Sequence, residues 1–258
     1  MAVCEFCGDD AKLTLEHAWP DWALTYVRGP RGGDYRIRSF RYAEPHATWT
    51  GPAPDVQVRI LCGPCNHDRL GTLEDECSRI WKPLASGNRA VLRRQDLPML
   101  AAWSVKTAMV FEFTADPGRV PYFTPFERRA IALSRTVPAS VTVLLARQDA
   151  RENQMFAHGR DLLQTEAGGL SFQTFLTTIA IGQLVVQVFA SRNPERPTPE
   201  LDSAAPQFAR QLWPPRGRNV LWPPRYQVNA EGLWTLATMG DASAEPGPVP
   251  QPLPRWKE

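Results

Sequence analysis

Four of the five cysteines in the chain are arranged as two Cys-x-x-Cys pairs, Cys4 with Cys7 and Cys62 with Cys65. Each pair sets two thiolates on one tight turn, which is half of a tetrahedral zinc site, so the two pairs together predict a Cys4 site. A redox-active dithiol is the alternative, but it needs only one pair and leaves the second unexplained. Because four thiolates close the coordination shell, we expect a structural Zn2+ ion.

Polar side chains that could do hydrolytic chemistry follow each cysteine pair. Glu16 and His17 come shortly after the first pair, and Asn66, His67 and Arg69 directly follow the second. Zinc binding would bring the two segments together. An imidazole can deprotonate water near neutral pH, and carboxylate and carboxamide oxygens suit Mg2+ or Mn2+. Because adjacent strand residues point to opposite faces, Glu16 and His17 would need a bulged backbone to serve one site.

At these residues the sequence resembles the HNH endonuclease family of ββα-metal nucleases, in its form with a zinc ribbon. The shared pattern is Cys-x-x-Cys, an acidic residue and a histidine followed by proline, and then Cys-x-x-Cys-Asn leading into a helix, over about residues 4–80. The resemblance implies that His17 is the general base and that Glu16 and Asn66 hold one catalytic Mg2+ or Mn2+ ion. It further implies that His67 is an additional catalytic residue or ligand and that Arg69 contacts phosphate.

The sequence departs from this family at one position. The family's central asparagine, which braces the loop and orients the base, is missing a few residues before the second cysteine pair, where Asp55 and Gln57 stand. Gln57 or Asp55 is the expected substitute. Two other interpretations stay open, namely that His17 is a buried structural histidine and that Asn66 is a helix N-cap.

Positive charge is concentrated in one segment, although the net charge of the chain is only +2, from 29 Lys and Arg against 27 Asp and Glu. The overall charge therefore does not indicate a polyanionic partner. Arginine suits bidentate contacts with phosphate, so we expect this segment to grip double-stranded DNA, with a solvated hairpin as the alternative. Its arginines are Arg28, Arg31, Arg36, Arg38 and Arg41.

The composition argues for a globular protein, with 43% hydrophobic and 22% charged residues. No apolar run reaches the ~18–20 residues of a membrane span, which argues against a membrane protein. The first residues show neither the cationic start nor the apolar core of a signal peptide, so we expect a cytoplasmic location, where disulfides do not form.

Hydrophobic periodicity predicts the elements that position these residues. Alternation predicts a strand over residues 56–61, and helical spacing from Leu70 to Trp81 predicts a helix that carries Cys77 as a core thiol. The capping box of Thr124 and Glu127 predicts another helix start. The remaining predicted elements are a buried central helix over 95–113, the capped helix to residue 134, and strands over 141–146, 171–181 and 184–190.

These observations predict an α+β protein in three parts. Residues 1–82 form a zinc-stapled, HNH-like ββα-metal core, residues 83–239 form an α+β domain of unknown role, and the proline-rich residues 240–258 form a disordered tail. The predicted function is that of a metal-dependent endonuclease that hydrolyses DNA phosphodiester bonds. The alternative is a catalytically inactive zinc-ribbon module that binds nucleic acid or a protein partner.

Overall fold

A computed structural model describes the greater part of the chain. For residues 24–26, 34–41, 44–52, 155–165 and 171 only the backbone is described. Arg28, Arg31, Asp55 and the predicted tail over 240–258 lie outside the described residues. The described residues are 2–26, 34–41, 44–52, 56–114, 120–149, 155–165, 171–193, 208–217, 219–229, 232–233 and 236–237.

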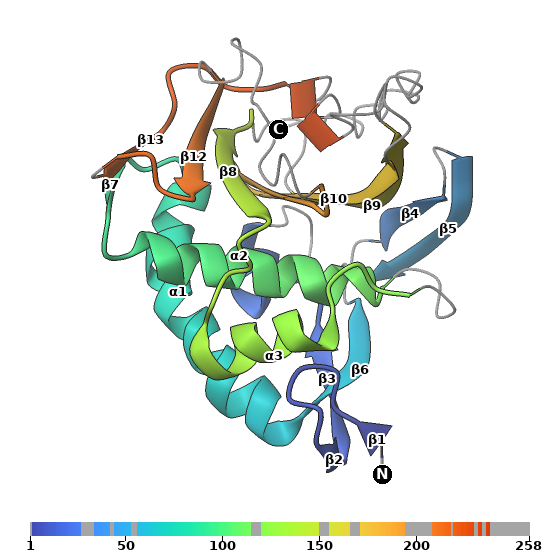
Figure 1. Cartoon of the computed structure of the whole chain (residues 1–258). Helices are drawn as coiled ribbons and strands as arrows, with labels where there is room; N and C mark the ends of the chain where they lie inside the picture. The colour runs from blue at the N-terminus through green and yellow to red at the C-terminus, as the bar shows by residue number, and fades with distance from the viewer. Residues whose placement is uncertain are drawn as a thin grey trace.

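The strands next to the paired cysteines form two small antiparallel pairs at one end of the molecule (Figure 1). Val58 and Ile60, on the strand that leads to the second cysteine pair, face inward, as the alternation predicted. The pairs are β1 (Ala2–Val3) with β2 (Asp10–Ala11), and β3 (Leu13–His17) with β6 (Gln57–Cys62). Between β3 and β6 lie the short helix η1 (Asp21–Tyr26) and a hairpin of β4 (Asp34–Arg41) and β5 (Glu44–Pro52).

Directly after β6 the chain becomes helical. The π-helix η2 (Pro64–Leu70) continues into α1 (Gly71–Ala85). At the junction a Cβ on Gly71 would lie 3.0 Å from the carbonyl oxygen of Asn66, so the close approach of the two turns favours glycine. Cys77 is fully buried on the inner face of α1, which confirms both the predicted helix and the core thiol.

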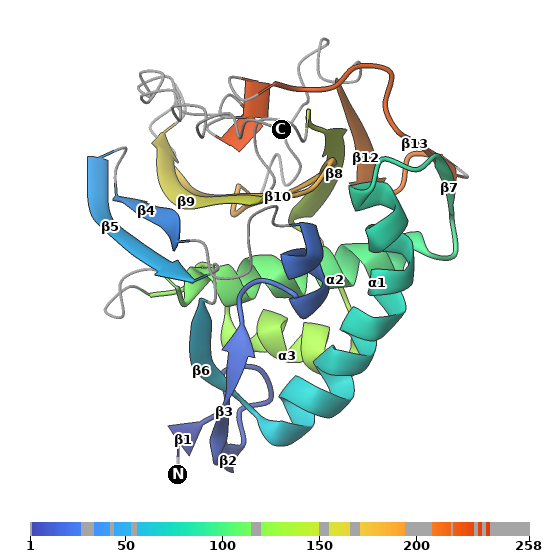
Figure 2. The same cartoon turned by 180° about the vertical axis from the view of Figure 1, so that it is seen from behind.

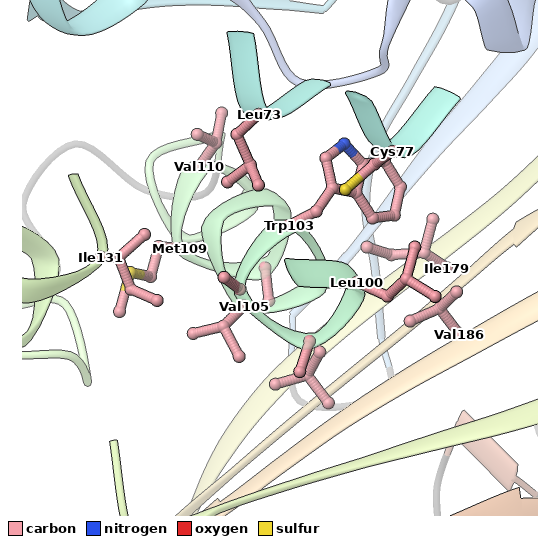
Figure 3. Packing of buried hydrophobic residues seen from close by; sticks show 14 of the residues in the cluster. Leu73, Cys77, Leu100, Trp103, Val105, Met109, Val110, Ile131, Ile179 and Val186 are labelled. Atoms are coloured by element: carbon pink, nitrogen blue, oxygen red, sulfur yellow. The ribbon is translucent and has the colours of Figure 1, made fainter. Parts of the chain in front are cut away.

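The centre of the molecule is α2 (Leu97–Glu112), the predicted buried helix (Figure 3). Its side chains contact elements on several sides: Trp103 packs towards α1 with its ring centroid 5.5 Å from that of Trp81, and Leu100 lies beside Ile179 of the sheet. A helix that is apolar all round must be covered all round, and this one is.

The capped helix is α3 (Pro125–Ser134), which packs against α2. Thr124 Oγ1 accepts from the Glu127 amide at 3.2 Å, and the Glu127 carboxylate accepts from the Thr124 amide at 2.8 Å. The capping box is therefore confirmed. Arg192 forms a bidentate ion pair with the same carboxylate, and both N–O distances are 2.7 Å. This ion pair links the start of the helix to the end of a sheet strand.

An antiparallel sheet lies on the other side of α2 (Figure 2). Its strand order is β12-β8-β11-β10-β9. Three of these strands match the predicted ones, and the strands at the two edges were not predicted. They are β8 (Val141–Arg147), β9 (Met155–Thr165), β10 (Ser171–Ile181), β11 (Leu184–Ser191) and β12 (Ala209–Trp213).

A separate two-stranded ribbon joins distant parts of the chain. It consists of β7 (Ala90–Arg93), which follows α1, and β13 (Asn219–Trp222), which follows β12. Neither strand was predicted, because four residues are too few for periodicity to reveal.

One hydrophobic cluster runs from the cysteines through α1 and α2 to the sheet, so the protein is a mixed α+β fold with a continuous core. The predicted boundary between residues 82 and 83 falls within α1, and buried residues on both sides belong to this cluster. Among the helices of the described residues, none is long and apolar enough to cross a bilayer.

Candidate metal centre and the polar residues beside it

The four paired cysteines converge at the end of the β3–β6 pair. Cys4 and Cys7 lie on the turn between β1 and β2, Cys62 ends β6, and Cys65 is in the first turn of η2. All four are buried, and their sulfur atoms lie within 4.8 Å of one another. Gly8 completes the first turn with a φ of 81°, a conformation that glycine adopts without strain.

The spacing of these sulfurs fits a zinc ion. Tetrahedral coordination with Zn–S bonds of about 2.3 Å places sulfurs roughly 3.8 Å apart, and Cys7 Sγ lies 3.7 Å from Cys62 Sγ. Within the described residues this is the one group of three or more Cys, His, Asp or Glu side chains arranged to hold a metal. Because sulfur would fill every position, Zn2+ here would be structural and would tie β1–β2 to β6 and η2.

The surroundings of the cluster lower the pKa of one cysteine thiol and raise that of another. Burial raises the pKa of the Cys4 thiol, but hydrogen bonds from the backbone of Cys7, Cys62 and Phe6 lower it further, to about 7. Burial raises the pKa of Cys65 to about 11, and the guanidinium of Arg69 lies 3.6 Å from its sulfur. Zinc binding must therefore displace protons from this cluster, at the expense of affinity in acid.

The pairing of the strand that carries Glu16 and His17 is irregular, as a site shared by these two residues would require. The β3–β6 register shifts by one residue between Thr14 and Glu16: Leu15 lies opposite both Arg59 and Ile60, so this is a bulge whose extra residue belongs to β6. Asn66 braces this bulge, because its Nδ2 donates to Thr14 Oγ1 at 3.0 Å and to the Leu15 carbonyl at 2.9 Å. Asn66 is therefore not a helix N-cap: the N-cap position of η2 is Gly63.

Beyond the bulge, Glu16 and His17 point to opposite faces, since they pair with the consecutive residues Val58 and Gln57. The His17 side chain is 40% exposed and is not a buried structural histidine. Its Nε2 lies 2.9 Å from the Gln57 side-chain amide, and its Nδ1 lies 3.6 Å from a carboxylate oxygen of the exposed Asp21. Of the two expected substitutes for the missing asparagine, Gln57 lies beside His17, and Asp55 lies outside the described residues.

Glu16 turns inward and pairs with a lysine 90 residues away. Its carboxylate accepts a hydrogen bond from Lys106 Nζ, which also lies 3.4 Å from Glu74 Oε2 on α1. Lys106 is only 4% exposed, and it sits in the middle of α2. Burial lowers the pKa of Lys106, but the two carboxylates outweigh this and raise it. Burial raises the pKa of Glu74, Lys106 lowers it and Glu16 raises it again, so that it lies above its ordinary value.

This arrangement does not fit a catalytic Mg2+ or Mn2+ at Glu16 and Asn66. The Glu16 carboxylate is held by an internal ammonium group. The charge that Glu16 would offer a divalent cation is already paired with Lys106.

Two other predicted site residues lie close in the chain to Cys65. His67 and Arg69 are exposed on η2. Arg36, Arg38 and Arg41 lie along β4, where the backbone alone is described.

Two site residues escaped the sequence reasoning, Lys106 and Asp21. A signal for Lys106 was present: it is the one charged residue between Leu97 and Phe111, in a run otherwise suited to burial. A charge in such a helix must find a partner, which predicts an acidic side chain opposite it. Asp21 has no comparable signal, because its proximity to His17 depends on how η1 folds back.

Comparisons of the chain with protein-family models, with curated proteins and with solved structures found no match.

Proposed function

We propose that the chain is an HNH-type endonuclease whose zinc-stapled β3–β6–α1 unit hydrolyses DNA phosphodiester bonds with His17 as the general base. The single observation that carries the proposal is a half-exposed imidazole, held by Gln57 beside a bulge that Asn66 braces. His17 comes from β3, Gln57 from β6 and Asn66 from the helix that follows. That order of elements agrees with the ββα unit of the family that the sequence resembles.

The contact with Gln57 supplies the orientation that a base requires. The oxygen and nitrogen of a side-chain amide can exchange places by a half turn. With Oε1 facing the ring, Gln57 accepts the Nε2–H of His17, which leaves the lone pair on Nδ1. Nδ1 can then take a proton from water, and the nearby Asp21 carboxylate stabilises the resulting imidazolium. Gln57 is a positioning residue in this scheme.

No step of the scheme passes through a catalytic metal ion, because Glu16, the expected charged ligand, is paired with Lys106. The exposed Arg69 on η2 is the cation proposed to contact the phosphate. Zinc in the cysteine cluster would hold the hairpin together and take no part in the chemistry.

The test is cleavage of supercoiled plasmid DNA by zinc-loaded protein, with and without added Mg2+ or Mn2+. We expect His17→Ala to lose about 10²- to 10⁴-fold in rate, the contribution of a general base. Asp75→Ala is the control, an exposed residue on α1 that should keep most of the activity. Gln57→Leu should shift the pH–rate profile, which a loss of structure alone would not do.

Wild-type protein that cleaves no substrate under any metal condition, or no faster than His17→Ala, would refute the enzymatic proposal. The second candidate would then hold: a zinc-ribbon module that binds nucleic acid or protein without chemistry. The pairing of Glu16 with Lys106 favours that candidate, because it removes the carboxylate from the His17 face.

A further inference from the structure

The β7–β13 ribbon presents an exposed face that no element of the described residues covers. Its register places Val91 opposite Leu221 and Arg93 opposite Asn219. Val91 is 56% exposed and Leu221 64%, and Arg93 and Asn219 are also exposed. The alternate residues of both strands face the core, so packing against the core holds the exposed face in place.

Positive charge gathers around this face. Among the described residues of the ribbon and its flanks, 86–96 and 213–226, arginines outnumber acids by five to one, whereas the whole chain is nearly neutral. The acid is Asp96. The arginines are Arg89, Arg93, Arg94, Arg216 and Arg225.

A groove runs along the ribbon where β7 leads into α2. It is lined by Val91, Arg93, Arg94, Gln95 and Asn219. Its lining contains two guanidinium groups and two carboxamides but no carboxylate. Neither Arg93 nor Arg94 forms an ion pair with an acid among the described residues. Two unpaired cations beside amide donors form a surface complementary to phosphate.

The ribbon also has the shape of a reader of duplex nucleic acid. The major groove of B-DNA, about 12 Å wide, admits a two-stranded β-ribbon. In such a complex arginines contact backbone phosphates, while side-chain amides and small apolar groups reach base edges. Arg93 and Arg94 match the first role, and Asn219 with the Val91–Leu221 pair matches the second.

We infer that the β7–β13 ribbon is a binding surface for duplex DNA, which Arg93 and Arg94 hold through its phosphates. The ribbon lies at the opposite end of α1 from the cysteine cluster (Figure 1). At 1.5 Å per residue the 15 residues of α1 separate the two by roughly 22 Å. The ribbon is therefore a second contact, separate from the His17 face, and it shares with the proposed function only the class of partner.

The experiment measures binding of full-length, zinc-loaded protein to a mixed-sequence DNA duplex of about 20 base pairs across a range of salt concentrations. The His17→Ala background prevents cleavage during the measurement. The ribbon variant is Arg93→Gln with Arg94→Gln. The matched control is Arg79→Gln with Arg129→Gln, two exposed arginines on α1 and α3.

Each phosphate contact adds about 0.9 to the slope of log affinity against log salt. The ribbon variant should therefore lower the slope by about 1.8, which is roughly a 60-fold loss of affinity at 0.1 M salt relative to 1 M. The control should bind as the parent does, and thermal unfolding should show that both variants fold. Poly-L-glutamate of equal charge should fail to displace the duplex.

Equal affinity and slope in the ribbon variant and the control would overturn the inference. So would ribbon-dependent binding of poly-L-glutamate in preference to DNA, which would assign the surface to an acidic protein. The outcome is independent of the proposed chemistry: if the wild type cleaves nothing but ribbon-dependent binding of the duplex is found, the hydrolase proposal fails and the ribbon inference stands.

Discussion

Removing the buried ammonium of Lys106 is the most revealing perturbation of this fold. Lys106→Met keeps much of the side-chain volume but leaves Glu16 and Glu74 facing each other without a cation. At 3.4 Å and an effective dielectric constant of about 20, the attraction between Lys106 and Glu74 alone is about 5 kcal/mol. Desolvation offsets part of this, and breaking a buried pair typically costs about 3–5 kcal/mol.

We therefore expect Lys106→Met to lower the free energy of unfolding by about 3–5 kcal/mol at pH 7. The assay is denaturant unfolding at saturating zinc, with Lys82→Met as the matched control. Lys82 is exposed on α1, and its substitution should change stability by about 0.5 kcal/mol or less.

The pH dependence identifies the cause. Without the ammonium, Lys106 no longer opposes the burial that raises the pKa of Glu74 above its ordinary value. The variant therefore loses stability as pH rises from the unfolded pKa of Glu74 through its folded pKa. The deficit relative to wild type should be small near pH 4 and complete by pH 8. Adding Glu16→Gln and Glu74→Gln should recover most of it at pH 7, because no buried charge remains. A deficit below about 1 kcal/mol, or one that does not change with pH, would refute this account.

Two further outcomes test the metal centre and the capped helix. Metal analysis should find one zinc ion per chain. Cys62→Ser should lose the zinc ion and unfold, while the matched core substitution Cys77→Ser should retain it. Equal zinc contents in the two variants would contradict the Cys4 site. Burial raises the pKa of Glu127, but Arg192 and the Thr124 backbone lower it further, to below its ordinary value. Its contribution to stability should therefore be present above the unfolded pKa and lost as pH falls through the folded pKa, so the gap between wild type and Glu127→Gln should close between pH 6 and pH 3.

The local structure around the candidate site could largely be anticipated. The paired cysteines, the strand before the second pair and the helix after it all follow from spacing within a few residues. So does the capping box at Thr124, because both of its hydrogen bonds join residues three apart. The short β7 and β13 could not be anticipated, since each is stabilised by a partner more than 120 residues away.

The bulge in the β3–β6 pair shows the limit of what could be predicted. A site shared by Glu16 and His17 would require an irregular backbone near them, and the strand pairing is irregular there. The requirement did not reveal that the bulge would leave the two side chains on opposite faces. That outcome depends on the register against β6, which places Glu16 opposite Val58 and over the core.

By itself the amino-acid sequence determined that four thiols come in two pairs suited to one ion, that α2 is buried, and where α3 begins. Those features rest on periodicity and on contacts between near neighbours, which the order of residues specifies directly. Only the tertiary structure decided that Glu16 meets Lys106, that Gln57 meets His17, and that an arginine-rimmed ribbon forms from two distant segments. The physical reason is that a side chain's remote partner is chosen by how whole elements pack, and packing is a property of the assembled core.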